Sequence, residues 1–275
     1  MGIGGQALIE GVLMRNKEKI CIAVRKDKKI IVKKEKIKFK ESKIPFFRGI
    51  TNLISTMYVG MKALNYSASI QIGKKEKENK VMSVITILIA VIFALFLFKF
   101  LPLLLTQLID NKLNLSSASF NITDGIIKLV ILVSYIYIIS RMKDIKRVFQ
   151  YHGAEHKAVN CYESKKSLTI NNVKKFSTTH KRCGTTFIIF VIFTSIIVYV
   201  FIPKSYSFLL KLSLRILLLP LIASMSYELL KLSAKYDNII TKTITSPGLL
   251  IQKLTTNEPD NKQIEVAIKS LKGVI

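Results

Sequence analysis

Two histidines and a glutamate lie within five consecutive residues of the chain, His152, Glu155 and His156, in an HxxEH pattern. On a helix that advances about 100° per residue, the two histidines fall on one face and Glu155 lies on its flank. Two imidazoles at this spacing can bind one divalent ion of the zinc class, and the neighbouring carboxylate can take a proton from water. The pattern therefore predicts a metal site with His152 and His156 as ligands and Glu155 as catalytic general base.

A second group of ligand types follows in the chain. The third and last histidine, His180, precedes Cys183 by three residues, and imidazole and thiolate both bind zinc-like ions. Glu228 follows the last long apolar segment, where a carboxylate at a membrane boundary is costly to desolvate. We therefore expect Glu228, His180 or Cys183 to complete the ligand set. The alternative is a basic loop with an incidental thiol and a solvated charge at a helix end.

Four long apolar segments must position these groups, at 81–105, 122–140, 185–202 and 206–227. Half of the residues are hydrophobic and the mean hydropathy is +0.36, which excludes general disorder and is high for a soluble protein. Crossing about 30 Å of hydrocarbon takes about 20 residues of helix. We expect a mainly α, polytopic membrane protein whose 81–227 domain holds four transmembrane helices in two hairpins.

Charges inside these segments call for partners. Asp124 and Lys128 are four residues apart and can pair on one helix face. Lys211 and Arg215 also share a helix face. These two cations either extend to the outer interface or contact an anionic lipid headgroup.

The distribution of positive charge predicts the topology. The net charge is +26, and 37 of the 43 Lys and Arg residues lie in 1–80, in 141–184 and after 227. The positive-inside rule then predicts a multi-pass protein of the plasma membrane. Both termini and the 141–184 loop are expected in the cytoplasm. The Lys-rich run at 17–43 lacks stacking aromatics, so we expect a partner surface of anionic lipid headgroups and no nucleic acid.

Three further parts flank the membrane domain. Residues 1–43 contain short β-prone runs at 20–24 and 30–32, which predict a small β element. Residues 45–72 carry an apolar stripe at helical spacing and predict an amphipathic helix at the membrane interface. The tail at 228–275 predicts two cytoplasmic helices, one beginning at Ser246 and Pro247 and one built on Ile264, Ala267, Ile268 and Leu271.

Six segments together resemble the bacterial YqhQ family of integral membrane proteins. They are GGQALIEG at 4–11, FFRG at 46–49, HGAEHK at 152–157, HKRCGT at 180–185, SYE at 226–228 and TTNEPD at 255–260. The resemblance covers nearly the whole chain in order, and it implies a membrane protein of unknown function described as a predicted metal-dependent enzyme. Lys181 stands where the family has proline, which leaves His180 and Cys183 in place.

Two classes of function follow. The first is a metal-dependent hydrolase at the cytoplasmic leaflet, with Glu155 as base. The second is a non-catalytic assembly factor or carrier of anionic lipid, in which the cluster is a structural metal site or polar packing. The number of ligands separates them, because a closed site has four protein ligands and a catalytic site leaves a position open.

Overall fold

The N-terminal part of the chain forms a four-stranded antiparallel sheet, which confirms the predicted β element. The computed structural model describes residues 3–37, 42, 44–73, 80–236 and 238–275. The strands follow one another in space as in sequence, β1 (Gly4–Leu8), β2 (Gly11–Asn16), β3 (Lys19–Lys26) and β4 (Lys29–Lys36). Cα atoms of Val12 and Ala23, and of Met14 and Cys21, lie opposite each other across β2 and β3.

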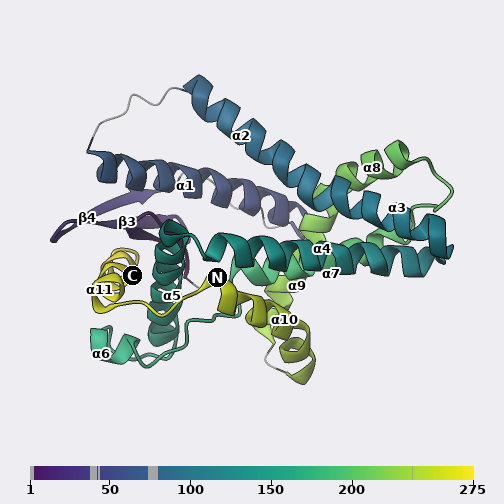
Figure 1. The fold of residues 1–275 in the computed structure, drawn as a ribbon. Coiled ribbons are helices and arrows are strands. Elements are labelled where there is room, and N and C mark those ends of the chain that lie inside the picture. The colour runs from purple at the N-terminus through teal and green to yellow at the C-terminus, as the bar shows by residue number, and fades with distance from the viewer. Residues whose placement is uncertain (1–2, 38–41, 43, 74–79, 237) are drawn as a thin grey trace.

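The two central strands of the sheet, β2 and β3, are buried on both faces. Because side chains alternate along a strand, Val12, Met14, Cys21 and Ala23 form one core with helices α5 (Lys143–Glu163) and α11 (Asn261–Lys272). The opposite face packs on helix α1 (Phe47–Ile72) through a second cluster: Leu8, Leu13, Ile20, Ile22, Val24, Val59 and Ala63. The sheet therefore lies between α1 and the α5–α11 pair (Figure 1).

Helix α1 confirms the predicted helical periodicity, and its two faces differ in side-chain size. The face against the protein carries mainly small residues, among them Gly49, Ser55, Gly60, Ala63 and Ser67. Bulky apolar side chains of the predicted stripe, such as Met57, Met61 and Leu64, are exposed. Small residues let α1 approach the sheet and α9 (Leu219–Lys235) closely, and the apolar stripe stays on the surface.

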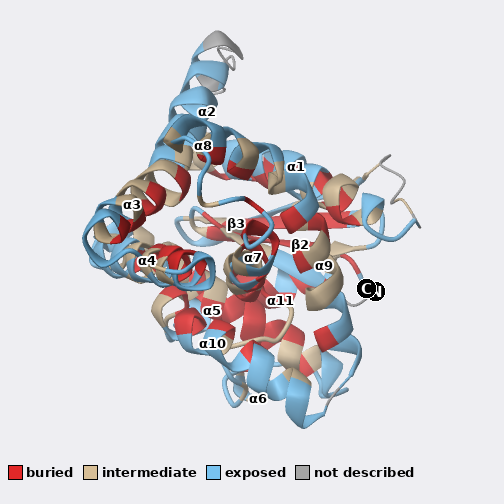
Figure 2. Ribbon diagram, turned by 90° about the vertical axis from the view of Figure 1, so that its right-hand side faces the viewer, coloured by how far each residue is buried: buried red, intermediate tan, exposed pale blue. Residues whose placement is uncertain are grey.

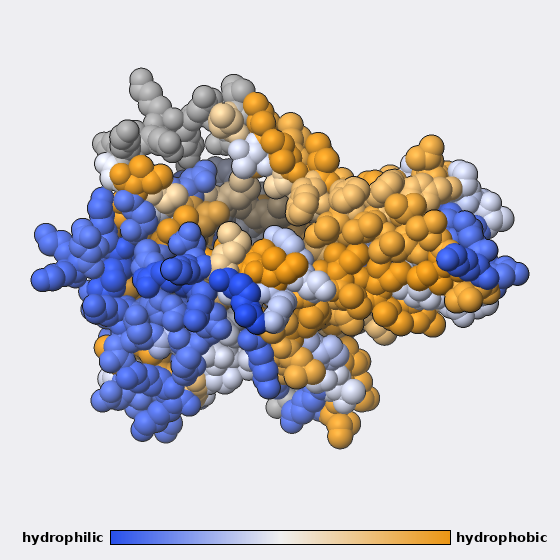
Figure 3. Space-filling model, in the orientation of Figure 1, coloured by the Kyte–Doolittle hydropathy of each residue, from blue (hydrophilic) through white to orange (hydrophobic). Residues whose placement is uncertain are grey.

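Among the described residues, two helices are long and apolar enough to cross a membrane. One is 30 residues long, Val84–Leu113, and joins α2 (Lys80–Leu95), the π-helical turn η1 (Phe96–Phe100) and α3 (Leu101–Leu113). The other is α4 (Ser117–Ser140). Apolar side chains cover this end of the molecule, whereas the sheet, α5 and α6 (Ile170–Val173) lie in the hydrophilic part (Figure 3).

The part of the chain that the structure describes offers two candidate spans, or three if one bent pair counts as a single span, where the sequence predicts four. The predicted 185–202 span is α7 (Gly184–Tyr199), which has only 16 residues. The predicted 206–227 span is split into α8 (Phe208–Leu217) and α9, which meet at 47°. Pro220 explains the break, because it lacks an N–H and its ring clashes with the carbonyl four residues earlier.

The C-terminal tail forms two helices, as predicted, but the first begins earlier. Helix α10 (Ile239–Thr255) starts after Asn238, which forms a reciprocal capping box with Thr241, and Pro247 lies inside the helix. The cap satisfies two backbone donors, which makes Asn238 a better start than Ser246. The predicted apolar positions of α11, from Ile264 to Leu271, are buried, and many buried residues gather where α11 meets α5 (Figure 2).

Candidate metal centre

Helix α5 presents His152 and His156 side by side, with ring centroids 4.4 Å apart. His152 donates its Nδ1–H to the carbonyl of Thr255 (2.9 Å), and His156 donates its Nδ1–H to the carbonyl of Thr178 (2.6 Å). Each neutral imidazole then keeps a bare Nε2, the arrangement seen when histidine binds a metal. Cys183 Sγ lies 3.3 Å from His152 Nε2, and one ligand atom from each of the three residues lies within 4.8 Å of the others.

The turn that carries Cys183 is fixed by helix ends and by one buried glutamine. Cys183 caps α7, and its Sγ accepts from the backbone N–H of Thr185 (3.4 Å). On α10, the fully buried amide of Gln252 accepts from His180 N (2.8 Å) and donates to His180 O (2.9 Å) and Thr186 Oγ1 (2.8 Å). These bonds hold the backbone of His180 and the thiol of Cys183 in place on either side of the turn.

Glu155 is enclosed beside the imidazoles, with 5% of its surface exposed. Its Oε2 lies 3.4 Å from His156 Nε2. Strand β1 covers it closely, since a Cβ added at Gly5 would lie 2.6 Å from Glu155 Cγ. Burial raises the pKa of the Glu155 carboxyl and lowers the pKa of His156, because both charged forms lose water. A neutral His156 is the form that binds metal.

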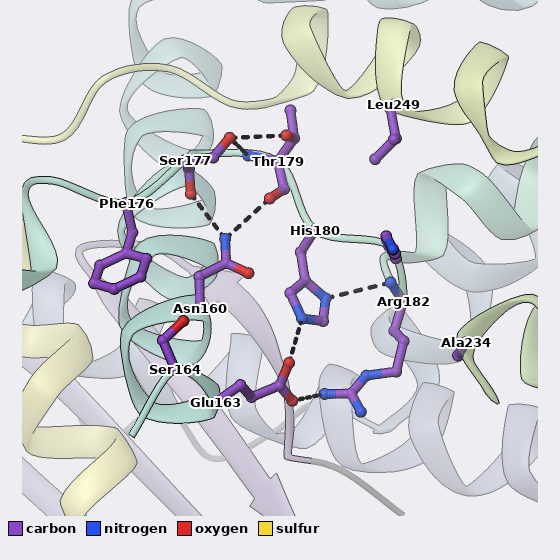
Figure 4. Close-up of a pocket in the computed structure, with 11 residues that line it drawn as sticks. Asn160, Glu163, Ser164, Phe176, Ser177, Thr179, His180, Arg182, Ala234 and Leu249 are labelled. Carbon is purple, nitrogen blue, oxygen red and sulfur yellow. Dashed lines mark hydrogen bonds and ion pairs between the residues drawn. The ribbon is translucent and has the colours of Figure 1, made fainter. Parts of the chain in front are cut away.

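His180 lies next to this group but both of its ring nitrogens are in use. Its Nδ1 accepts from the backbone N–H of Arg182 (3.3 Å), and its Nε2 donates to Glu163 (3.2 Å). The Arg182 guanidinium also pairs with Glu163, and these bonds, led by that from His180, lower the pKa of Glu163 (Figure 4). His180 thus acts as a hydrogen-bonded neighbour, with its ring centroid 5.8 Å from that of His156.

A pocket of about 470 Å³ opens beside His180. It lies between the C-terminal end of α5, the 176–182 segment, α9 and α10, and is lined by residues that include Asn160, Glu163, Phe176, Arg182, Ala234 and Leu249 (Figure 4). Polar side chains of the lining lie around His180, so a small polar ligand has space beside that residue.

Glu228 has a different partner from the one expected. Both of its carboxylate oxygens pair with the guanidinium of Arg48, at Nε (2.7 Å) and at Nη2, and Oε1 also accepts from Phe46 N (3.3 Å). The segments 46–49 and 226–228 therefore form a contact of their own between α1 and α9. A bidentate carboxylate–guanidinium pair is among the stronger ion pairs in proteins, so Arg48 sets the orientation of Glu228 in this structure.

Sequence reasoning missed the residues that hold the ligands. Thr178 and Thr255 act through backbone carbonyls, which have no signature in the sequence, and Gln252 carries only an amide. Gly153 offers one readable signal, because a Cβ there would run into the carbonyl oxygen of Asn257. A glycine directly after His152 allows another backbone segment to pack closely against the helix, and it therefore predicts a backbone contact near that histidine.

Fold and site together define a mainly helical protein with a small sheet, at least two helices long and apolar enough to cross a membrane, and a largely buried His/His/Cys group. The chain belongs to the family described as protein of unknown function (DUF1385), whose model matches residues 44–275. It is also 36% identical over 293 residues to the uncharacterized protein YqhQ of Bacillus subtilis (strain 168), covering 99% of this chain and 92% of that protein. These matches confirm the resemblance to the YqhQ family. No solved structure matches the chain.

Proposed function

We propose that the protein is a metal-dependent hydrolase whose site lies at the cytoplasmic face of the membrane. One observation carries the proposal. The two imidazoles use Nδ1 for backbone carbonyls, and His152 Nε2 meets the Cys183 thiol at 3.3 Å. His152, His156 and Cys183 would hold the ion, and three protein ligands leave a coordination position open.

Glu155 is the proton acceptor in this proposal. A bound zinc-like ion supplies positive charge that polarises a substrate oxygen and acidifies water. The Glu155 carboxylate lies beside His156 Nε2, and burial makes it a stronger base than an exposed carboxylate. The pocket beside His180 gives the substrate its place, with Arg182 and Glu163 at its wall.

The experiment compares metal content and activity in matched variants purified without chelator. His152→Ala and His156→Ala should lose stoichiometric metal in elemental analysis, whereas His180→Gln should retain it, because both ring nitrogens of His180 are engaged in other hydrogen bonds. Glu155→Gln should retain metal and lose hydrolysis of ester and amide probes or function in cells. A metal-loaded and fully functional Glu155→Gln protein contradicts the role of base, and a metal-free wild type contradicts the site.

The proposed location is a multi-pass cell membrane protein with both termini and the 141–184 segment in the cytoplasm. The distribution of Lys and Arg supports it. The three native cysteines are buried, and Lys112 and Lys166 are exposed. The single substitutions Lys112→Cys and Lys166→Cys therefore introduce thiols that report on which side of the membrane each position lies. Impermeant maleimide on intact cells should label the first and spare the second, and the reverse pattern contradicts the topology.

The second candidate is a structural metal site or polar cluster in a non-catalytic assembly factor or lipid carrier. It is favoured by one observation, that Cys183 already caps α7 through Thr185 N and so has a structural task. Cobalt substitution separates the two. A visible spectrum that shifts when azide is added shows the open position of a hydrolase, and an unchanged spectrum shows a closed site.

A further inference from the structure

A second buried polar group lies among the long apolar helices. Lys99 on η1, Lys128 on α4 and Arg215 on α8 surround one carboxylate, Asp124 on α4, and each of the four is at most 7% exposed. Arg215 Nη1 donates to Asp124 Oδ1 (2.6 Å), and Lys128 pairs with Asp124 Oδ2. The Lys128 and Arg215 cations also lie over the ring of Tyr199, both 4.6 Å from its centroid.

The charges in this group do not balance. Asp124 is shared by two cations, and the Lys99 ammonium donates only to the Tyr199 hydroxyl (3.0 Å), so within the described chain Lys99 makes no ion pair. Arg215 Nε is buried without a hydrogen-bond partner among the described residues. Buried charges in proteins are normally paired, and arginine keeps its proton.

More cations lead from this group toward the turn between α3 and α4. Lys211 donates to Gln107 Oε1 (2.6 Å) and lies 5.0 Å from the ring centroid of Phe120, which Arg215 also faces. Lys204, which is partly exposed, pairs with Asp110 (2.8 Å). We call the five cations Lys204, Lys211, Arg215, Lys128 and Lys99 the cation ladder; within the described chain only Asp110 and Asp124 pair with them.

The helices are irregular where they carry the ladder. Lys99 lies in the π-helical turn η1, and π-helical turns are frequent at functional sites. Arg215 lies in the last turn of α8, just before the 47° break to α9. Broken helices at membrane depth are typical of binding sites, where they bring polar groups to a ligand.

We propose that the cation ladder binds a phosphate-class oxyanion inside the long-helix region. The Arg215 guanidinium and the Lys99 ammonium supply donors and the missing counter-charge, and guanidinium geometry suits phosphate oxygens. Burial of Lys211 and Arg215, at 4% and 2% exposed, rules out the simpler expectation that they extend to the outer interface. The entry lies at the α3–α4 end, where Lys204 reaches the surface.

The oxyanion has two possible sources, a free phosphate and a phospholipid headgroup. An apolar pocket of about 360 Å³ is lined by Val198, Leu214 and Leu218, which pack in one cluster with Tyr199. An acyl chain therefore has an apolar surface next to the cations. The test must distinguish the two sources.

The decisive variant is Lys99→Met, because it removes a charge without breaking an ion pair. Binding of radiolabelled inorganic phosphate and of short-chain phosphatidic acid is measured on the full protein in neutral detergent, with phosphatidylcholine of equal chain length as control lipid. We expect Lys99→Met and Arg215→Gln to weaken binding roughly tenfold or more, and the exposed control Lys112→Gln to match wild type. Binding of phosphate identifies the free ion as the source, and binding of phosphatidic acid alone identifies the headgroup.

Thermal unfolding gives a second readout that does not depend on Arg215→Gln folding. Without probe, Lys99→Met should unfold at the same temperature as wild type or a higher one, because an unpaired buried charge is gone. Adding the bound probe should raise the unfolding temperature of wild type and Lys112→Gln, and not that of Lys99→Met. The proposal is overturned if wild type binds neither probe, or if Lys99→Met binds and is stabilised like wild type.

Discussion

The candidate metal centre and the cation ladder are both polar and largely buried, yet the polar groups present in excess are of opposite kinds. In the metal centre, two imidazoles and a thiol bring three potential ligand atoms within 4.8 Å of one another, and two backbone carbonyls orient the imidazoles. In the ladder, positive charges and N–H donors exceed the carboxylates. An excess of lone pairs suits a cation, and an excess of donors suits an anion.

This contrast shows that burial alone does not define a site. Polar groups in a core are ordinarily satisfied, so the direction of the imbalance indicates the chemistry of the missing partner. The predictions below separate the two regions by asking whether a change in one leaves the other intact.

The largest effect is expected for Asp124→Asn in the ladder. The change leaves Lys128 and Arg215 without their carboxylate, and breaking a buried pair costs about 3–5 kcal/mol. Denaturant unfolding in detergent should show this loss, while metal per folded molecule stays at the wild-type level. A loss below about 1 kcal/mol would mean that the site is hydrated like an exposed pair.

Gly153→Ala should affect the metal centre. The new Cβ would run into the carbonyl oxygen of Asn257 and displace the segment whose Thr255 carbonyl orients His152. We expect a loss of about 1–3 kcal/mol in unfolding free energy and weaker metal binding by titration calorimetry. Gly184→Ala is the matched control, because nothing lies within 4 Å of a Cβ there. Equal behaviour of the two variants would contradict the close approach.

Glu228→Gln tests whether Glu228 belongs to the metal centre, as the sequence predicts, or only to its ion pair with Arg48. The variant breaks the pair between Arg48 and Glu228 that joins α1 to α9, and we expect a loss of about 1–2 kcal/mol, since both side chains are mostly buried. Elemental analysis should find the metal unchanged. Loss of metal with an unchanged unfolding temperature would instead restore Glu228 as a ligand.

The smallest effect concerns acid pH at the sheet. The bond from Arg25 holds the pKa of Glu265 on α11 below its ordinary value of about 4.3. A lowered folded-state pKa gives stability that is present above the unfolded value and is lost as pH falls through the folded value. The unfolding-temperature difference between wild type and Glu265→Gln should therefore shrink below about pH 4. The expected effect is small because the Arg25–Glu265 pair is partly exposed. A difference in unfolding temperature that does not change with pH would contradict the lowered pKa of Glu265.

Much of the local structure was readable from the sequence. Period-two runs predicted the sheet, helical spacing predicted α1 and α11, and the i,i+4 pair of Asp124 and Lys128 is confirmed. The spacing of His152 and His156 also placed them correctly on one helix face. These features depend on residues a few positions apart, where backbone geometry leaves few choices.

Partners across long distances in the chain were not readable. Glu228 pairs with Arg48, 180 residues away, and Asp124 pairs with Arg215, 91 residues away. In the sequence, His180 and Cys183 are equivalent candidates for ligands. In the fold, the Cys183 sulfur faces His152 Nε2, whereas both ring nitrogens of His180 form other hydrogen bonds.

The sequence by itself determined the composition of this protein, an apolar and strongly basic chain with the local periods of a small sheet and amphipathic helices. The tertiary structure decided which side chains meet, how far the apolar segments run before Pro220 breaks them, and which lone pairs and charges remain without a partner. The physical reason is that secondary structure follows from short-range sterics and burial patterns. A site depends on backbone carbonyls and buried ion pairs, and packing alone brings those together.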